Sequence, residues 1–173
     1  TGIAADDAFY FSPGINAGFP WLYATGRWNT NFHVSGFSYG LGTSIRLSGQ
    51  WRMCIDVTTG SLAKDYPAAA DTLANSNIGV KGRLSRLELQ AEKGLNKRLC
   101  LRFGPVLNLL HTTYYLNGEK TAPENMIFPR QEIENNYYLI KPIYTISNSY
   151  SDQSVSNNKI WIGFRAGLYF LLR

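Results

Sequence analysis

The stretch FSYGLGTSIRL, residues 37–47, decides the fold prediction. Its odd-numbered positions hold aromatic, aliphatic or β-branched side chains, and its even-numbered positions hold only Ser, Gly and Arg. Because successive side chains of a β-strand point to opposite faces, this period of two predicts a strand with one apolar face and one small or charged face. A helix would spread the same residues around its circumference.

The same period of two recurs along the chain. It is present in residues 9–19, 51–58, 87–92, 99–109 and 160–172, and more loosely in residues 137–147. An eighth strand is expected because single-chain bacterial barrels have an even number, and residues 127–133 are the free segment of suitable length, although they contain Pro129. We expect a single domain over residues 1–173, since domains typically have about 100 to 200 residues.

The predicted connections alternate between short and long. The short ones, 48–50, 94–96 and 134–136, suit tight hairpins, whereas 20–36, 59–77, 111–126 and 147–158 are long and rich in Asn, Ser, Thr and Gly. This alternation is typical of outer-membrane barrels, which have short turns at one end and long loops at the other.

Charged side chains share a face with the small residues. They are Arg46, Arg52, Asp56, Glu88, Glu92, Arg102 and Arg165. An eight-stranded barrel is just wide enough to be filled by side chains, so charges interleaved with Gly can pair inside it. A soluble barrel gains nothing from Gly on a solvated face. The pattern therefore predicts an all-β, closed, antiparallel, up-and-down transmembrane β-barrel with these residues as an interior charged network.

Composition and charge exclude several classes of protein. Charged residues make up 17% of the 173 residues, against about 25% in a typical soluble domain, and the net charge is +5. The arginines are scattered singly, and Lys97 and Arg98 form the one adjacent basic pair, so we expect no nucleic-acid partner. No apolar run reaches the roughly 18 residues of a membrane-spanning helix.

The cysteines and the N-terminal residues carry no site signal. Cys54 and Cys100 form no CxxC motif, and both histidines lie far from them in the sequence. We therefore expect two free thiols, no metal ion and no cofactor. Residues 1–7 lack the basic start and apolar middle of a secretory signal, which suggests an exported chain in its mature form.

Four stretches carry a family resemblance: FSYGLGTSIRL (37–47), LELQAE (87–92), RFGPVLNLL (102–110) and GFRAGLYFLL (163–172). They resemble the small outer-membrane barrel domains grouped as OmpA-like and PorT-like. The resemblance implies an eight-stranded barrel of the Gram-negative outer membrane with periplasmic termini. The chain departs from the family by ending in Arg173 rather than in an aromatic residue.

The candidates for chemistry are few. His33 precedes Ser35 by two residues, as in outer-membrane lipid A deacylase barrels, where a histidine activates a serine nucleophile. No acidic residue that would orient His33 is identifiable, and His111 has no serine partner, so we expect no catalytic residue. Recognition is expected of aromatic residues assigned to the long loops: Trp21, Tyr23, Trp28, Tyr66, Tyr114 and Tyr115.

These observations predict a non-enzymatic integral outer-membrane protein with a structural or accessory role in the cell envelope. We expect it to contact outer-membrane lipid or lipopolysaccharide and other envelope proteins in a complex. Three alternatives stay open at this point: a soluble lipocalin-like binding barrel, an outer-membrane lipid-modifying enzyme and a small pore.

Overall fold

The computed structural model describes residues 1–19, 21–66, 77–123, 135–150 and 155–170, and within them the chain forms ten strands in one sheet. The strands are β1 (Gly2–Asp6), β2 (Ser12–Phe19), β3 (Leu22–Thr30), β4 (Ser35–Arg46), β5 (Trp51–Tyr66), β6 (Ile78–Gly94), β7 (Leu99–Leu116), β8 (Glu119–Lys120), β9 (Ser147–Tyr150) and β10 (Ser156–Phe170).

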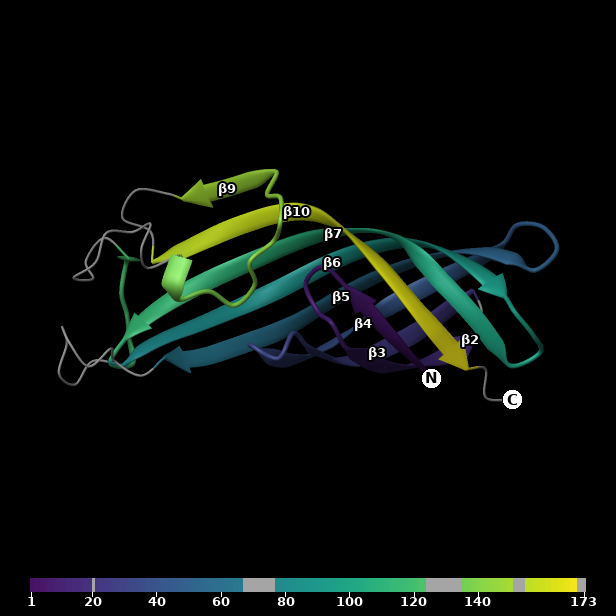
Figure 1. Ribbon diagram of the computed structural model, residues 1–173, viewed down its shortest axis with the longest axis horizontal. Helices are drawn as coiled ribbons and strands as arrows, with labels where there is room; N and C mark the ends of the chain where they lie inside the picture. The colour runs from purple at the N-terminus through teal and green to yellow at the C-terminus, as the bar shows by residue number, and fades with distance from the viewer. Residues whose placement is uncertain (20, 67–76, 124–134, 151–154, 171–173) are drawn as a thin grey trace.

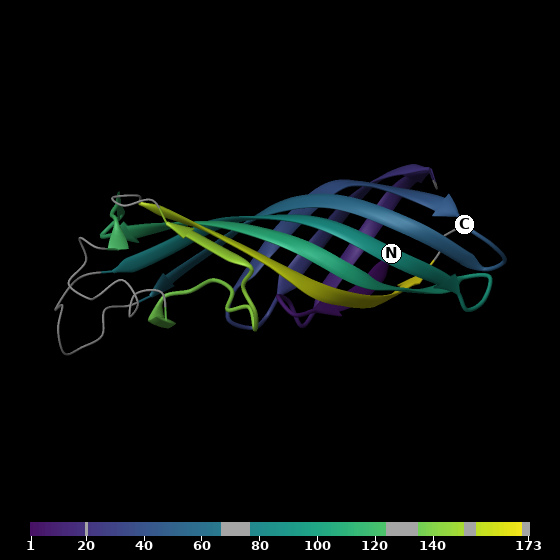
Figure 2. The same ribbon diagram turned by 90° about the horizontal axis from the view of Figure 1, so that it is seen from above.

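Eight of these strands form a ring (Figures 1 and 2). Consecutive strands from β1 to β7 pair antiparallel, β7 pairs with β10, and β10 pairs with β1. Strands β8 and β9 lie outside the ring, on the edges of β7 and β10. The prediction of an all-β chain with eight antiparallel strands in a barrel-like arrangement is confirmed.

The identity of some strands differs from the prediction. Residues 22–30, assigned to a long loop, form β3, and Gly2–Asp6, which was not expected to be a strand, forms β1. The period of two is present in β3, but its outward positions include Ala24 and Gly26, so its apolar face is weak in the sequence. β1 is only five residues long, too short to show a clear period.

The predicted strand at 137–147 is not a member of the ring. Its consecutive residues Leu139 and Ile140 are both buried, which a strand with one buried face does not allow. Only its last residue enters β9. The predicted hairpin at 134–136 therefore does not join two ring strands, and the predicted strand at 127–133 lies outside the described residues.

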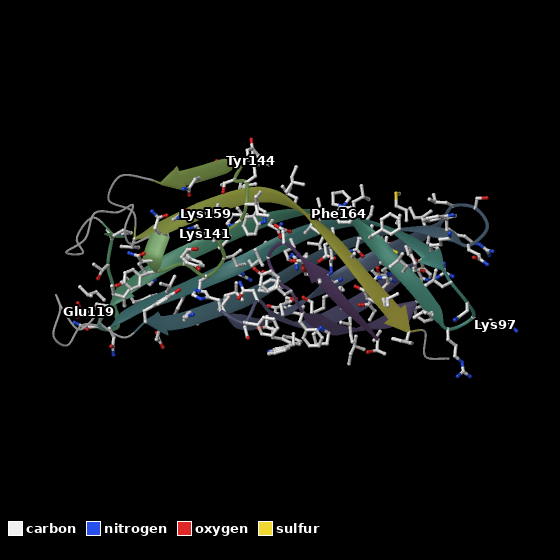
Figure 3. The ribbon with its side chains drawn as sticks, in the orientation of Figure 1. Lys97, Glu119, Lys141, Tyr144, Lys159 and Phe164 are labelled. Carbon is white, nitrogen blue, oxygen red and sulfur yellow. The ribbon has the colours of Figure 1, made fainter. Side chains whose placement is uncertain are left out.

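Two hairpins lie at one end of the ring, which we call the short-turn end, together with Thr1 and the last residue of β10. Residues 47–50 join β4 to β5 and residues 95–98 join β6 to β7, which confirms the two predicted hairpins. Figure 3 shows Lys97 at this end and Glu119 at the opposite end. The strict alternation is wrong, because the opposite end has short links too, at 7–11 and 31–34, beside the long ones at 67–77 and 117–155.

The ring strands differ in length, so the wall of the ring is taller on one side than on the other. β5, β6, β7 and β10 have 15 to 18 residues, whereas β1 to β4 have 5 to 12. In Figure 1 the long strands continue past the short ones, away from the chain ends. We call this part, residues 61–66, 78–84, 110–116 and 156–160, the extension.

The concave side of the extension is filled by apolar side chains. Leu139 and Ile140, from the long link before β9, pack there against Val80, Leu110 and Trp161. We call this group, with the other buried apolar residues around it, the apolar cluster: Ala8, Phe9, Val34, Leu62, Ile78, Leu84 and Tyr114. Residues 137–140 thus cover a concave surface that β1 to β4 do not reach.

The outer surface of the ring is apolar. Large side chains point outward along every ring strand, among them Ile3, Ile15, Trp28, Phe37, Leu41, Ile45, Val57, Leu87, Leu89, Leu107, Ile162 and Leu168. Phe164 of β10 projects away from the ring in Figure 3. We call this surface the apolar band. No helix in the described part of the chain has the length and apolarity needed to cross a membrane.

Candidate functional site

The interior of the ring holds a chain of alternating charges that begins at Asp6, the last residue of β1. The Asp6 Oδ2 atom accepts hydrogen bonds from Arg86 at 2.7 Å and from Arg165 at 2.6 Å. Its Oδ1 atom accepts from the backbone N–H groups of Ala8 and Phe9, which fixes the turn that follows β1. Asp6 is therefore held from both sides, and its side chain is fully buried.

Two further carboxylates lie on neighbouring strands and share one arginine. Asp56 of β5 and Glu88 of β6 face each other directly in the strand register. Like charges in this position repel, which destabilises a strand pair. Arg27 of β3 lies between them, with its NH2 group 2.9 Å from Asp56 Oδ2 and its NH1 group hydrogen-bonded to Glu88. Arg27 thus neutralises a repulsion that the sheet register creates.

The chain of charges continues toward the short-turn end. Arg102 Nε donates to Glu92 Oε2 at 2.6 Å, and its NH1 group lies 4.0 Å from Asp56 Oδ2. Its guanidinium also lies over the ring of Tyr169, 4.6 Å from the centroid, which adds a cation–π contact. Arg52 ends the series 3.7 Å from Glu92, with 39% of its side chain exposed.

These contacts define what we call the charge ladder. In order, it consists of Arg86, Asp6, Arg165, Glu88, Arg27, Asp56, Arg102, Glu92 and Arg52. Each carboxylate lies between two arginines. Removing a charge from water costs several kcal/mol, and only close pairing with further hydrogen bonds offsets that cost. The ladder pairs every one of its carboxylates, with residues from β1, β3, β5, β6, β7 and β10. Within the described residues, Arg27 Nε and the Nε and NH2 groups of Arg165 are buried without a hydrogen-bond partner.

Small residues make room for the ladder. A Cβ atom at Gly42 of β4 would overlap both Asp56 and the ring of Tyr23, whose hydroxyl donates to Asp56 Oδ1 at 2.6 Å. A Cβ atom at Gly163 of β10 would overlap the carboxylate of Asp7. These two inward positions are therefore Gly because Asp56 and Tyr23 in one case, and Asp7 in the other, occupy the space that a side chain would fill.

The structure brings most of the predicted charged residues together. Asp56, Glu88, Glu92, Arg102 and Arg165 are buried in the ladder, and Arg52 is its half-exposed end. Arg46 lies outside it, exposed at the short-turn end and without an ion pair in the described part of the chain.

Three residues of the charge ladder were not among the predicted interior charges. Asp6 and Arg27 lie on β1 and β3, which were not recognised as strands, and Arg86 lies one residue before the predicted strand at 87–92. A period of two extended backward from Glu88 would have found Arg86, because it shares that inward face.

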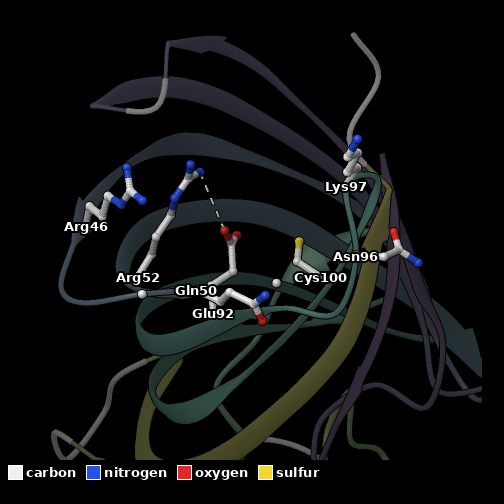
Figure 4. Close-up of a pocket in the computed structure, with 9 residues that line it drawn as sticks. Arg46, Gln50, Arg52, Glu92, Asn96, Lys97 and Cys100 are labelled. Atoms are coloured by element: carbon white, nitrogen blue, oxygen red, sulfur yellow. Dashed lines mark ion pairs between the residues drawn. The ribbon is translucent and has the colours of Figure 1, made fainter.

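A cavity of about 400 Å³ opens beside Arg52 and Glu92, at the end of the charge ladder. Figure 4 shows Arg46 and Arg52 side by side at this mouth, with the Arg52–Glu92 ion pair drawn and Cys100 nearby. Cys54 and Cys100 are free, buried thiols on β5 and β7, with β6 between them. No group of three or more His, Cys, Asp or Glu side chains suited to a metal ion occurs within the described ranges.

His33 and Ser35 each form hydrogen bonds with other residues. Lys64 Nζ lies 2.8 Å from His33 Nδ1, and His33 Nε2 lies 2.8 Å from the hydroxyl of Tyr66 and 3.0 Å from the backbone oxygen of Tyr138. The Ser35 hydroxyl instead donates to Thr30 at 2.8 Å. His33 therefore ties the β3–β4 link to β5 and to the segment that covers the apolar cluster.

Tyr66 strengthens the same attachment. Its hydroxyl donates to the backbone oxygen of Tyr138 at 2.5 Å, and its ring packs edge-on against Tyr137. Burial raises the pKa of Tyr66 to about 12, so the hydroxyl keeps its proton at neutral pH. The hydroxyl is therefore a permanent donor to this segment under physiological conditions.

Most of the aromatic residues assigned to loops lie on strands. Tyr23 and Tyr114 are buried, the former beside the ladder and the latter in the apolar cluster. Trp28 points outward from β3, Tyr115 lies on β7, and Tyr66 ends β5. Trp21 alone of this set lies between two strands, β2 and β3, where it stacks on Phe19. The loop placement is corrected for the rest.

No protein-family model matches this chain, and searches of curated proteins and of solved structures return no significant match. Its function is therefore inferred from the geometry of this chain alone.

Proposed function

We propose that this chain is a non-enzymatic integral β-barrel protein of a Gram-negative outer membrane, with a structural or accessory role in the cell envelope. The single observation that carries the proposal is the arrangement of polarity across the ring. Charged side chains are buried inside, and large apolar side chains are exposed outside. A soluble barrel has the opposite arrangement, with its apolar residues in the core.

The size of the apolar band supports a lipid environment. Phe37, Leu41 and Ile45 on β4 are each more than half exposed, as are Ile162 and Phe164 on β10. Soluble monomers rarely expose contiguous apolar patches larger than a few hundred Å². At a rise of about 3.3 Å per residue and a tilt of about 40°, residues 37–47 span about 25 Å, which is the height of the lipid-facing band of outer-membrane barrels.

Aromatic pairs near the edges of the band support the same assignment. Phe19 stacks on Trp21, and Trp51 packs edge-on against Phe103, near the short-turn end. Toward the other end Phe11 packs against Trp28. Aromatic residues collect at both interfaces of membrane proteins because one part of the ring system is apolar and the other tolerates water.

The charge ladder favours a structural role over a pore. Its residues come from both sides of the ring and meet in the middle, with Arg27 linking β3 to β5 and β6. A conducting pore needs a continuous water path with binding weak enough for ions to leave. Paired, buried charges act instead as cross-links between strands that are distant in the chain.

The extension suits contacts beyond the membrane. Its outward side chains are mostly polar, and the segment before β9 leaves Ile143 and Tyr144 strongly exposed. Exposed apolar residues on a folded segment are typical of protein contacts, which favours an accessory subunit of an envelope complex. The hydrogen bond of His33 with Lys64 and that of Ser35 with Thr30 disfavour the alternative of a lipid-modifying enzyme.

The proposal is tested by placing one arginine in the band and one outside it. Leu41 and Ser61 both point outward and are exposed on the neighbouring strands β4 and β5, but only Leu41 lies within the band. In a membrane barrel, Leu41→Arg lowers the free energy of unfolding from lipid vesicles by about 2–4 kcal/mol. Ser61→Arg faces Arg83 across the β5–β6 pair, so like-charge repulsion lowers the same free energy by at most about 1 kcal/mol.

The measurement is urea unfolding in vesicles, followed by heat-modifiable migration on detergent gels. Equal tolerance of the two arginines, together with recovery of the natural protein in the aqueous periplasmic fraction, would sink the proposal in favour of a soluble barrel.

A further inference from the structure

The mouth of the ring at the short-turn end places two arginines directly opposite each other. Arg46, the last residue of β4, and Arg52, the second residue of β5, are partners in the register of the two strands that the turn at 47–50 joins. Directly opposed residues have Cβ atoms about 5 Å apart. Both arginines line the cavity of about 400 Å³ at this end. The register therefore brings two guanidinium groups to one cavity.

The ring interior contains the same arrangement with the opposite sign. Asp56 and Glu88 are also directly opposed, and Arg27 neutralises their repulsion from within the chain. Arg46 and Arg52 share no such counter-ion in the part of the chain that the structure describes. Water screens their repulsion at the exposed mouth, so the fold tolerates it. The pair nevertheless concentrates positive charge that an anion can neutralise.

The other charges on the cavity wall leave it positive. Lys97 lines it from the turn between β6 and β7, and Glu92 is the only acidic side chain among the described residues that line it. Glu92 Oε2 accepts from Arg102 Nε at 2.6 Å, whereas Glu92 Oε1 lies 3.7 Å from Arg52 NH1, beyond hydrogen-bond distance. Glu92 is thus already engaged by the charge ladder, and the three lining cations are in excess.

Both arginine side chains reach the open part of the cavity. Figure 4 shows Arg46 extending toward Arg52, whose guanidinium lies above Glu92. Arg46 is exposed, and the side chain of Arg52 is 39% exposed. The single ion pair of Arg52, with Glu92, keeps its guanidinium at this cavity because Glu92 lines the same wall. An anion in the cavity can therefore contact both arginines at once.

The donors of the two arginines fit a phosphate better than a carboxylate. Each guanidinium presents a planar fork of N–H donors that bonds two oxygens of one anion. One fork already satisfies both oxygens of a carboxylate. A phosphate monoester has three terminal oxygens and a charge of about −1.5 to −2 at neutral pH. Two opposed forks therefore match both its oxygens and its charge.

We propose that Arg46 and Arg52 form a binding site for a phosphate group at the short-turn mouth, supplied by inorganic phosphate or by a small soluble phosphate monoester. The phosphate lies between the two arginines, as Arg27 lies between two carboxylates in the ring interior. Lys97 adds positive charge from the same cavity wall. The site belongs to the wall of the ring itself, so the inference goes beyond the proposed membrane role and does not depend on it.

Two control variants separate a site from a general excess of charge. Arg98 lies at the same end of the ring and is exposed, but it is not among the residues that line the cavity. Arg98→Ala therefore removes one cation from this end and leaves the opposed pair intact. Arg46→Lys keeps the charge at the pair but loses the planar fork, because a lysine ammonium is a point charge.

The experiment is an NMR titration of the full ¹⁵N-labelled chain, in buffer or in micelles of an uncharged, phosphate-free detergent. The probes are inorganic phosphate and glycerol 3-phosphate, with acetate at equal ionic strength as the reference. We expect saturable shifts of the Arg46 and Arg52 side-chain N–H signals, with a dissociation constant for phosphate on the order of 1 mM. Arg46→Met weakens binding by about tenfold, Arg46→Lys by about threefold and Arg98→Ala by less than about twofold.

The outcomes decide for or against the site. Equal shifts with phosphate and acetate, or binding to Arg46→Lys as tight as to the natural protein, mean that charge alone attracts the anion and overturn the assignment. Equal weakening by Arg98→Ala and Arg46→Met overturns it as well. Whichever probe binds more tightly identifies the source of the phosphate, and either result supports the site. The membrane location is tested separately by unfolding from vesicles, so failure of one proposal leaves the other standing.

Discussion

Strand β6 crosses two regions of the molecule in which the same alternation has opposite meanings. Inside the ring its inward residues are Glu88 and Glu92, and its outward neighbours are Leu87 and Leu89. In the extension its inward residues are Val80 and Leu84, and its outward ones are Lys81 and Arg83. The polarity of the two faces exchanges within a few positions, between Leu84 and Leu87.

This exchange is what the proposed membrane location predicts, with a different medium outside the strand in each region. An outward apolar face with a charged interior is stable where hydrocarbon lies outside, and an outward polar face with an apolar interior is stable where water lies outside. Under the proposed membrane location, the boundary between lipid and water crosses β6 between these two regions.

The ring interior and the concave side of the extension are also stabilised by different forces. The charge ladder depends on geometry, because each buried carboxylate must meet its arginines closely to offset the loss of hydration. The apolar cluster depends on area, since burial contributes about 25 cal/mol per Å² with little dependence on direction. Substitutions in the charge ladder and in the apolar cluster are therefore expected to differ in how much they lower stability and in how far along the chain their effect extends.

The largest effect is expected for Arg27, because its guanidinium neutralises the repulsion between the carboxylates of Asp56 and Glu88. Arg27→Met leaves two facing carboxylates buried without their shared cation, and we expect a loss of about 3–5 kcal/mol in the free energy of unfolding from vesicles. Urea titration followed by heat-modifiable migration measures it. Adding Glu88→Gln to this variant should recover part of the loss.

Arg46→Met is the matched control for that prediction. Arg46 is exposed at the short-turn mouth, so its replacement should change stability by less than about 0.5 kcal/mol. If Arg27→Met and Arg46→Met were equally mild, the ladder would contribute no net stability, and the contrast between the two interiors would be lost.

An intermediate and local effect is expected in the apolar cluster. Leu139→Ala removes a fully buried side chain from the segment that covers the extension, at a cost of about 2–5 kcal/mol in local opening. Faster amide hydrogen exchange in residues 135–146, with unchanged protection in β5 and β6 of the ring, is the expected readout. Ile143→Ala, at a position 98% exposed in the same segment, is the control that should leave exchange unchanged.

The smallest effect is expected for Tyr66, whose hydroxyl donates one hydrogen bond to the covering segment. Tyr66→Phe should loosen this attachment by about 0.5–1.5 kcal/mol at neutral pH. Because the folded pKa of Tyr66 is raised to about 12 from 10, its contribution is present below pH 10 and is lost as the pH rises through 12.

Hydrogen exchange of residues 135–146 between pH 7 and pH 12 measures this loss, after correction for the intrinsic exchange rate at each pH. The natural protein should open progressively above pH 10. Tyr66→Phe should start more open and show less change, and an identical pH profile for the two proteins would contradict the role given to the hydroxyl.

Sequence analysis found the strands whose apolar face is continuous and missed those whose face is interrupted. Residues 37–47 and 160–172 were recognised because one side of each carries large side chains throughout. β3 has the same period, but with Ala24 and Gly26 outward, and so it was read as a loop. In the segment 137–147, large residues at alternate positions suggested a strand, although Leu139 and Ile140 are both buried.

The sequence by itself determined the local alternation, the two short hairpins and the set of side chains available for an inward charged face. Only the tertiary structure decided which charges meet. It places Arg27 between Asp56 and Glu88, and it pairs Asp6 with Arg165, which is 159 residues away in the sequence. Alternation is a property of neighbouring residues, whereas these contacts join residues that become neighbours only when β10 pairs with β1 and the strands form a ring.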